Sequence, residues 1–304
     1  MPTLSPGPPG RPAPDARRLR QTARSFGTDA ARYDRSRPRY PQPLVDRLAA
    51  PTPTPTPTST STPTPTSTPT GTASGSGGPL VLDVGCGTGI VARQFRDVGC
   101  RVVGVEVDPR MAGLARGAGV DVEVADFESW DPAGRRFDAV VSGQTWHWLD
   151  AAAAATVAAR ALLPGGRLAV FWNVPELPPE VTRALAAACL RVAPDSPFRL
   201  GDPTSRAADG YQLLLDAAAD GIRATGDFDA PERWRHDWQH TYTRDAWLDQ
   251  LPTHGALTRL APEQVQQILT EVGAAIDALG GRFTAAYATL TVTATRRARR
   301  GIGG

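Results

Sequence analysis

The stretch VLDVGCGTGI, residues 81–90, carries the pattern that decides the fold. An apolar run is followed by three glycines at alternate positions, Gly85, Gly87 and Gly89. Glycines between a strand and a helix permit positive φ and let the backbone approach a ligand closely. A dinucleotide fingerprint, G-x-G-x-x-G, would place its third glycine where this chain has Ile90. The spacing predicts a nucleotide-like ligand other than a dinucleotide, with a purely structural turn as the alternative.

Acidic residues around the loop favour a cationic ligand that carries a ribose. Asp83, inside the stretch, would repel a pyrophosphate but suits an amine. Glu106 ends the next apolar run, where a carboxylate can accept hydrogen bonds from both ribose hydroxyls. Asp108 competes for that role, but we assign it to the N-cap of the following helix. Asp126 and Phe127 offer an acceptor and an aromatic surface for an adenine, and capping by Asp126 is an equally good interpretation.

Strand and helix patterns alternate from residue 79 onward. Apolar strands are expected at 80–85, 101–107, 120–126, 137–143 and 166–173, with a last strand at 282–295. The helical stretches between them are expected at 90–98, 109–118 and 151–163, followed by 178–192, 206–220 and 262–279. Continuous apolar strands separated by amphipathic helices indicate an α/β fold with a parallel sheet covered on both faces.

The composition also predicts how the chain is divided. Residues 1–24 form a Pro- and Arg-rich tail, and 25–50 contain two short helices. Residues 51–78 are rich in Thr, Pro, Ser and Gly and lack large apolar side chains, so they cannot offset their ordering entropy and act as a linker. The main domain covers 79–297, with a helical substrate cap at about 174–225, and 298–304 form a second tail.

Overall composition excludes several classes of protein. With 33 basic and 31 acidic residues, the chain lacks the basic excess of a nucleic-acid-binding domain. Three cysteines without paired spacing favour a reduced, cytoplasmic protein. Neither a signal peptide nor a membrane span is expected. His236 and His240 have the spacing of a metal-binding helix but lack the glutamate of H-E-x-x-H, so no metal is expected.

Six stretches together resemble the class I S-adenosylmethionine-dependent methyltransferases, of the small-molecule type 11 group. They are FGTDAARYDRSRPRYP, VLDVGCGTG, VVGVEVDPRM, FDAVVSGQTWHW, ALLPGGRLAVFWN and GGRFTAAYATLTVTATRR, and they span about residues 25–297. The resemblance implies a Rossmann-like sheet of seven strands, mostly parallel with the last antiparallel, helices on both faces and a helical cap. It also implies that S-adenosylmethionine is the cofactor and a small molecule the acceptor.

Carried onto this sequence, the resemblance assigns a set of cofactor residues. The methionine portion would lie against the glycine loop, with Asp83 near its ammonium group. The ribose would be held by Glu106, and Arg37 would close over the cofactor and pair with its carboxylate. The remaining positions surround the adenine, the methyl-donor end and the entrance: Val107, Met111, Asp126, Phe127, Ser142, Gln144 and Tyr33.

The segment QTWHW places aromatic side chains just beyond the strand that faces the methyl donor. Trp146, His147 and Trp148 are the substrate candidates. His147 could accept a proton from a substrate hydroxyl or only position the substrate. No catalytic residue is obligatory if the acceptor is already a nucleophile, because the cofactor supplies the reactivity.

Two functions of other classes are the alternatives. An NAD-dependent oxidoreductase would need the later glycine and a catalytic dyad on the nicotinamide side. A non-catalytic nucleoside-binding protein would keep the sheet but lose cofactor residues. The sequence fixes neither the acceptor nor the oligomeric state.

Overall fold

The computed structural model describes residues 25–50, 77–194 and 209–298. The expected N-terminal tail, most of the Thr/Pro-rich linker and nearly all of the C-terminal tail lie outside these residues. The described chain is built around a seven-stranded sheet in the order β3-β2-β1-β4-β5-β7-β6. Its strands are β1 (Leu80–Val84), β2 (Arg101–Glu106), β3 (Asp121–Val124), β4 (Phe137–Gly143), β5 (Leu162–Glu176), β6 (Glu232–Thr243) and β7 (Arg282–Thr295).

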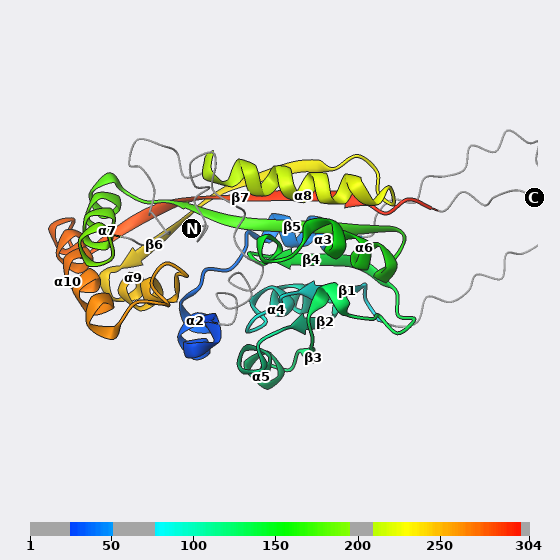
Figure 1. Ribbon diagram of the computed structural model, residues 1–304, viewed down its shortest axis with the longest axis horizontal. Helices are drawn as coiled ribbons and strands as arrows, with labels where there is room; N and C mark the ends of the chain where they lie inside the picture. Colours follow the sequence, from blue (N-terminus) through cyan, green and yellow to red (C-terminus); the bar gives the residue numbers. More distant parts are fainter. Residues whose placement is uncertain (1–24, 51–76, 195–208, 299–304) are drawn as a thin grey trace, which may run out of the picture.

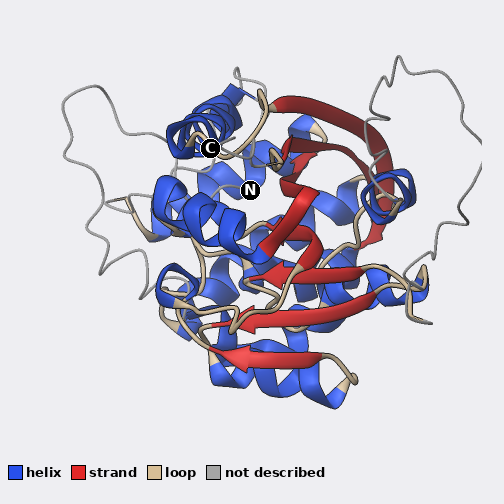
Figure 2. Ribbon diagram, turned by 90° about the vertical axis from the view of Figure 1, so that its right-hand side faces the viewer, coloured by secondary structure: helices blue, strands red, loops and turns tan. Residues whose placement is uncertain are grey.

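Strands β1 to β5 pair in parallel, whereas β7 runs antiparallel to both β5 and β6. The strands lie one above another across the molecule with helices on either side (Figure 2). The predicted fold, a mostly parallel sheet whose last strand is antiparallel, is therefore confirmed.

Alternate residues of the central strands face two helix layers, which is why their sequences read as continuous apolar runs. In β1, Val81 packs in a cluster with α3 (Gln42–Ala49), α4 (Ile90–Asp97) and α5 (Pro109–Gly117). Its neighbour Leu82 packs on the other face, in a cluster with α6 (Ala151–Ala161) and α8 (Gln212–Thr225). The sheet core is thus closed on both sides.

A third apolar cluster lies beyond the sheet core. It joins the ends of β6 and β7 to α7 (Pro179–Val192), α9 (Arg244–Gln250) and α10 (Pro262–Ala278). Figure 1 shows these three helices gathered at one end of the long strands. We call these three helices, together with the segment that joins α9 to α10, the cap. The helical stretch expected at about 174–225 divides between the two regions, because α7 packs on α10 while α8 packs on α6 and β7.

The aromatic segment after α8 forms the edge strand β6. Its alternating side chains include His236 and His240, which therefore lie on a strand and not on a metal-binding helix. Among the described residues, no group of three or more potential ligands could hold a metal ion. No helix in the described ranges is long and apolar enough to cross a membrane.

The packing of α8 can be tested by comparing two leucines of that helix. Leu215 is buried in the sheet core, whereas Leu213 is 55% exposed. Leu215→Ala should lower the free energy of unfolding by about 2–5 kcal/mol because it leaves a cavity. Leu213→Ala should change it by less than about 0.5 kcal/mol. Urea denaturation of both variants gives the comparison, and equally small effects would mean that α8 does not complete the core.

Candidate functional site

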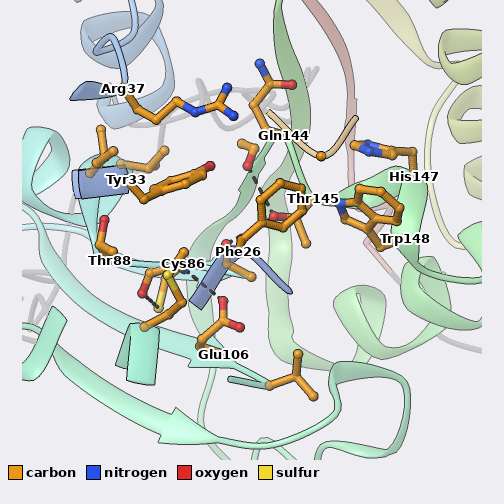
Figure 3. Close-up of a pocket in the computed structure, with 18 of the residues that line it drawn as sticks. Phe26, Tyr33, Arg37, Cys86, Thr88, Glu106, Gln144, Thr145, His147 and Trp148 are labelled. Atoms are coloured by element: carbon orange, nitrogen blue, oxygen red, sulfur yellow. Dashed lines mark hydrogen bonds between the residues drawn. The ribbon is translucent and has the colours of Figure 1, made fainter. Parts of the chain in front are cut away.

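A large cavity opens where the strand order reverses, between β1 and β4. In open α/β sheets the carboxyl ends of the strands at such a point form the ligand crevice. The cavity holds about 1580 Å³ of space between protein atoms, part of it open to solvent. Figure 3 shows the residues that surround it.

The glycine loop forms one wall of the cavity and depends on the absence of side chains. Gly85 has a φ of +63°, and a Cβ there would lie 2.1 Å from the Cγ2 of Thr145. The Thr145 hydroxyl instead donates to the Gly85 carbonyl at 3.1 Å, which joins the loop after β1 to the loop after β4. Gly87 also has positive φ, and a Cβ on it would approach only the Met111 methyl, at 3.4 Å. The backbone at Gly87 therefore lies open to a ligand.

Glu106 fixes this loop from the end of β2. One carboxylate oxygen accepts the N–H of Gly87 at 2.9 Å, and the other accepts the N–H of Asp108 at 2.8 Å. Asp108 accepts the N–H of Arg110 and caps α5, as expected. Burial raises the pKa of Glu106, while the backbone donors act in the opposite direction. Glu106 lines the cavity, so its lone pairs not used by the backbone can receive a ligand.

Asp83 lies behind the loop and not on the cavity wall. It is 1% exposed, and neither carboxyl oxygen has a hydrogen bond of good geometry within the described residues. Burial and the Glu106 carboxylate raise the pKa of Asp83 to about 8, although the N–H of Ala92 opposes this shift. A buried carboxylate is costly without a partner, and a positive group bound nearby would favour its ionised form.

The acidic side of the cavity is built by β2, β3 and the turns after them. Val107, Met111, Asp126 and Phe127 all line it, as the resemblance implied. Asp126 also accepts the N–H of Glu128 at 3.2 Å and caps a short 3-10 helix, η2 (Phe127–Ser129). The two interpretations left open for Asp126 are therefore compatible. Val107 and Phe127 add apolar surface to the same wall.

The N-terminal segment covers the cavity. It comprises η1 (Phe26–Asp29) and α2 (Ala30–Ser36). The Phe26 ring lies 6.0 Å from that of Tyr33 and 6.0 Å from that of Trp148, so this segment reaches the loop after β4. The segment is also joined to α4, the helix after the glycine loop, because the Asp34 carboxylate accepts a hydrogen bond from Arg93 at 2.7 Å.

His147 is held as a hydrogen-bond donor. The indole N–H of Trp172 donates to its Nδ1 at 3.1 Å, and an indole nitrogen can only donate. Burial lowers the pKa of the imidazole to about 3. The ring is therefore neutral at ordinary pH, and its proton is on Nε2. Because His147 lines the cavity, it offers a donor to a ligand and has no vacant nitrogen to act as a base.

The far end of the cavity is formed by the cap, and the sequence did not predict its residues. Gln250 and His254 line it from α9 and from just after η5 (Leu251–Thr253), and Tyr287 lines it from β7. The Tyr287 hydroxyl lies 2.7 Å from that of Tyr242. Asn173 contributes from β5. These residues are far apart along the chain, so no local pattern predicts that they form one group. Only the antiparallel pairing of β7 with β5 brings Tyr287 near Asn173.

The structure brings most of the predicted residues to one cavity. The lining includes Tyr33, Arg37, Gly85, Gly87, Glu106, Val107, Met111, Asp126, Phe127, Gln144, His147 and Trp148. Four predicted residues lie behind it. Asp83 is buried, Gly89 caps α4, and the Ser142 hydroxyl donates to the Val84 carbonyl at 3.0 Å. Trp146 is buried in the sheet core beside Phe127, so it does not face a substrate.

Comparison with known proteins agrees with this geometry. Residues 82–170 match the family model described as "Methyltransferase domain". An uncharacterized methyltransferase of Mycobacterium tuberculosis is 32% identical over 157 residues, which cover 51% of this chain and 54% of the relative. A malonyl-[acyl-carrier protein] O-methyltransferase of Enterobacter lignolyticus is 36% identical over 110 residues, covering 35% of this chain and 44% of that protein. The chain spans about half the length of the curated relatives it matches.

A solved structure shares the fold over most of its length. It is a putative type II methyltransferase from Anaeromyxobacter dehalogenans, with a TM-score of 0.55 and 21% sequence identity. The match covers 86% of this chain and 97% of the other. The likeness therefore includes the long strands that carry the cap.

The state assigned to His147 can be measured directly. In a protein with 15N-labelled histidine, Nδ1 of His147 should give the shift of an unprotonated nitrogen, and the ring should not titrate above about pH 4, because burial disfavours its charged form. The exposed His240 is a reference within the same spectrum. Trp172→Phe removes the indole N–H donor, so both neutral tautomers of His147 should become populated while the fold stays unchanged. Titration of His147 near pH 6.5 would contradict the assignment.

Proposed function

We propose that this chain, whose residues 82–170 form a class I S-adenosylmethionine-dependent methyltransferase domain, transfers a methyl group from S-adenosylmethionine to a small-molecule acceptor. The observation that carries the proposal is the loop arrangement at the β1/β4 reversal. There an open glycine backbone and the Glu106 carboxylate line one cavity, and the buried carboxyl of Asp83 lies behind the glycine loop.

The residues present fit this cofactor. Glu106 would hold the ribose hydroxyls, and Val107 with Met111 would flank the adenine, whose edge would face Asp126. The backbone at Gly85 and Gly87 would carry the methionine portion, with Asp83 behind it near the ammonium group. Tyr33 and Phe26 would close over the bound molecule. When bound, the cofactor supplies an electrophilic methyl group on a sulfonium, and the protein positions the acceptor beside it.

The alternative functions fit less well. A dinucleotide pyrophosphate would meet Glu106 and Asp126 on one side of the cavity, with no cation among the described lining residues there. A non-catalytic nucleoside-binding protein would not need the donor-rich end of the cavity, formed by the cap, beside the acidic end. Calorimetric titration with S-adenosylmethionine and with NAD, beside an assay for S-adenosylhomocysteine formation on a metabolite extract, tests the proposal. Binding of NAD alone would refute it, and binding of S-adenosylmethionine without turnover would favour the non-catalytic alternative.

A paired glycine substitution tests the binding mode. Gly87→Ala places a methyl group in the cavity, and Gly134→Ala places one at an exposed turn with nothing within 4 Å. Both residues have positive φ, so both variants should lose about 1–2 kcal/mol of stability. Only Gly87→Ala should weaken S-adenosylmethionine binding, by at least about tenfold, which corresponds to roughly 1.4 kcal/mol. Calorimetry in which both variants bind like the wild type would place the cofactor elsewhere.

The raised pKa of Asp83 predicts proton release on binding. At pH 7 this carboxyl is mostly protonated in the free protein, because its pKa is about 8. A cation bound nearby favours the ionised form and lowers that pKa. Affinity should therefore rise as the pH increases toward 8 and level off above it. Calorimetry at pH 7 in buffers of different ionisation enthalpy should show release of up to about one proton.

Asp83→Asn is the control for this experiment, since it removes the titrating group but keeps the shape. The variant should bind more weakly and release no proton from this site. Equal proton release by the wild type and by Asp83→Asn would show that Asp83 is not coupled to the ligand.

A further inference from the structure

Charge is divided unequally between the two ends of the cavity. The acidic residues among its described lining are Glu106, Asp126 and Glu128, all on the side of β2 and η2. At the other end the lining contains Arg37, His254 and Tyr287 and no carboxylate among the described residues. A ligand that fills both ends therefore meets a negative wall on one side and a positive group on the other.

Arg37 is the fixed positive group at that end. Its Nε donates to the Thr253 hydroxyl at 2.9 Å, and its Nη2 donates to the Thr253 carbonyl at 2.5 Å. These bonds anchor the guanidinium to the cap and not to the glycine loop. No carboxylate of the described residues lies within ion-pair distance of Arg37. Its Nη1 has no hydrogen bond within these residues, and the guanidinium carbon lies 4.9 Å from the centroid of the Tyr33 ring. Figure 3 shows the guanidinium extending over the cavity toward Gln144.

His147, His254, Tyr40 and Tyr287 line the cavity, and none of the four can take a proton from an acceptor near neutral pH. His147 is locked with its proton on Nε2, facing the ligand. Burial and the Arg37 guanidinium lower the pKa of His254 well below its usual range, so it too stays neutral and weakly basic. Burial raises the pKa of Tyr40 and of Tyr287, which keeps both hydroxyls protonated. A nucleophile at this end must arrive already deprotonated.

We infer that the methyl acceptor is a small carboxylic acid, bound as its carboxylate by the free edge of Arg37. This inference rests on the proposed methyltransferase function and names its substrate class. A guanidinium edge matches the two oxygens of a carboxylate. A single cation also matches the one negative charge of a carboxylate better than the charge of about −1.5 to −2 on a phosphomonoester.

Methyl transfer to a carboxylate then needs no general base. A carboxylate oxygen forms the new bond to the methyl carbon while the bond from that carbon to sulfur breaks, and its electron pair stays on sulfur. A methyl ester and a thioether result, and no proton is released. Ester formation also removes the charge that Arg37 holds, so the product should leave more readily than the acid binds.

Binding measurements test this assignment without knowledge of the natural acceptor. The probes are acetate, butyrate, benzoate and phenylacetate, each beside its primary amide, titrated into the full chain saturated with S-adenosylhomocysteine and followed by NMR. At least one acid should bind about tenfold or more tightly than its amide, as expected for charge-assisted hydrogen bonds. Arg37→Met should remove that preference but change the dissociation constant of S-adenosylmethionine by less than about twofold.

Two further variants complete the experiment. Arg37→Lys keeps the positive charge but loses the paired N–H donors of the guanidinium, so it should retain part of the preference for acids. Arg35→Met is the matched control, because Arg35 lies in α2 just before Arg37, is 54% exposed and is paired with Asp249 at 2.7 Å, and it does not line the cavity. It should behave like the wild type.

The outcomes separate this inference from the proposed function. Equal binding of acids and amides, or no binding of either at millimolar concentration, would overturn the carboxylate assignment. Loss of S-adenosylmethionine affinity in Arg37→Met with acid binding intact would show that Arg37 pairs with the cofactor. Failure of the wild type to bind S-adenosylmethionine would instead refute the proposed function itself.

Discussion

The hydrogen bond from the Gly87 N–H to Glu106, 2.9 Å long, is the contact on which the site depends. It holds the loop after β1 against the end of β2, and Thr145 ties the same loop to the end of β4. Three strand ends are thereby fixed around one cavity. The loop can follow this path only because Gly85 and Gly87 carry no side chain. Backbone that would otherwise be a simple turn becomes a surface for a ligand.

Local sequence patterns predicted the half of the molecule that surrounds this contact. Apolar runs identify β1, β2, β4 and β5 because these strands are buried along most of their length, and the loop residues follow their strands directly. Glu106 could be predicted because its place at the end of β2 is set by the strand itself. The sequence predicted that Asp83 lies near a ligand ammonium group, but a sequence pattern could not show that it lies behind the loop, with its pKa raised to about 8.

The end of the cavity formed by the cap could not be predicted in the same way. Gln250, His254 and Tyr287 come together through the antiparallel pairing of β7 and the packing of the cap, which are contacts between distant segments. The edge strand β6 was hard to identify because its side chains alternate between half-buried and exposed positions, and aromatic residues suit either assignment. Trp146 shows the reverse difficulty. Its position in the QTWHW segment suggests a substrate contact, yet the 3-10 turn directs it into the core.

A crystal structure of the full chain with S-adenosylhomocysteine would show directly whether the cofactor lies against the glycine loop. We expect the ribose hydroxyls to lie within hydrogen-bonding distance of the Glu106 carboxylate. The amino group should lie on the Asp83 side of the glycine loop, leaving the free edge of Arg37 open beside the sulfur. A ligand placed away from Glu106 would contradict the proposed cofactor site. A ligand whose carboxylate occupies the edge of Arg37 would contradict the proposed acceptor site.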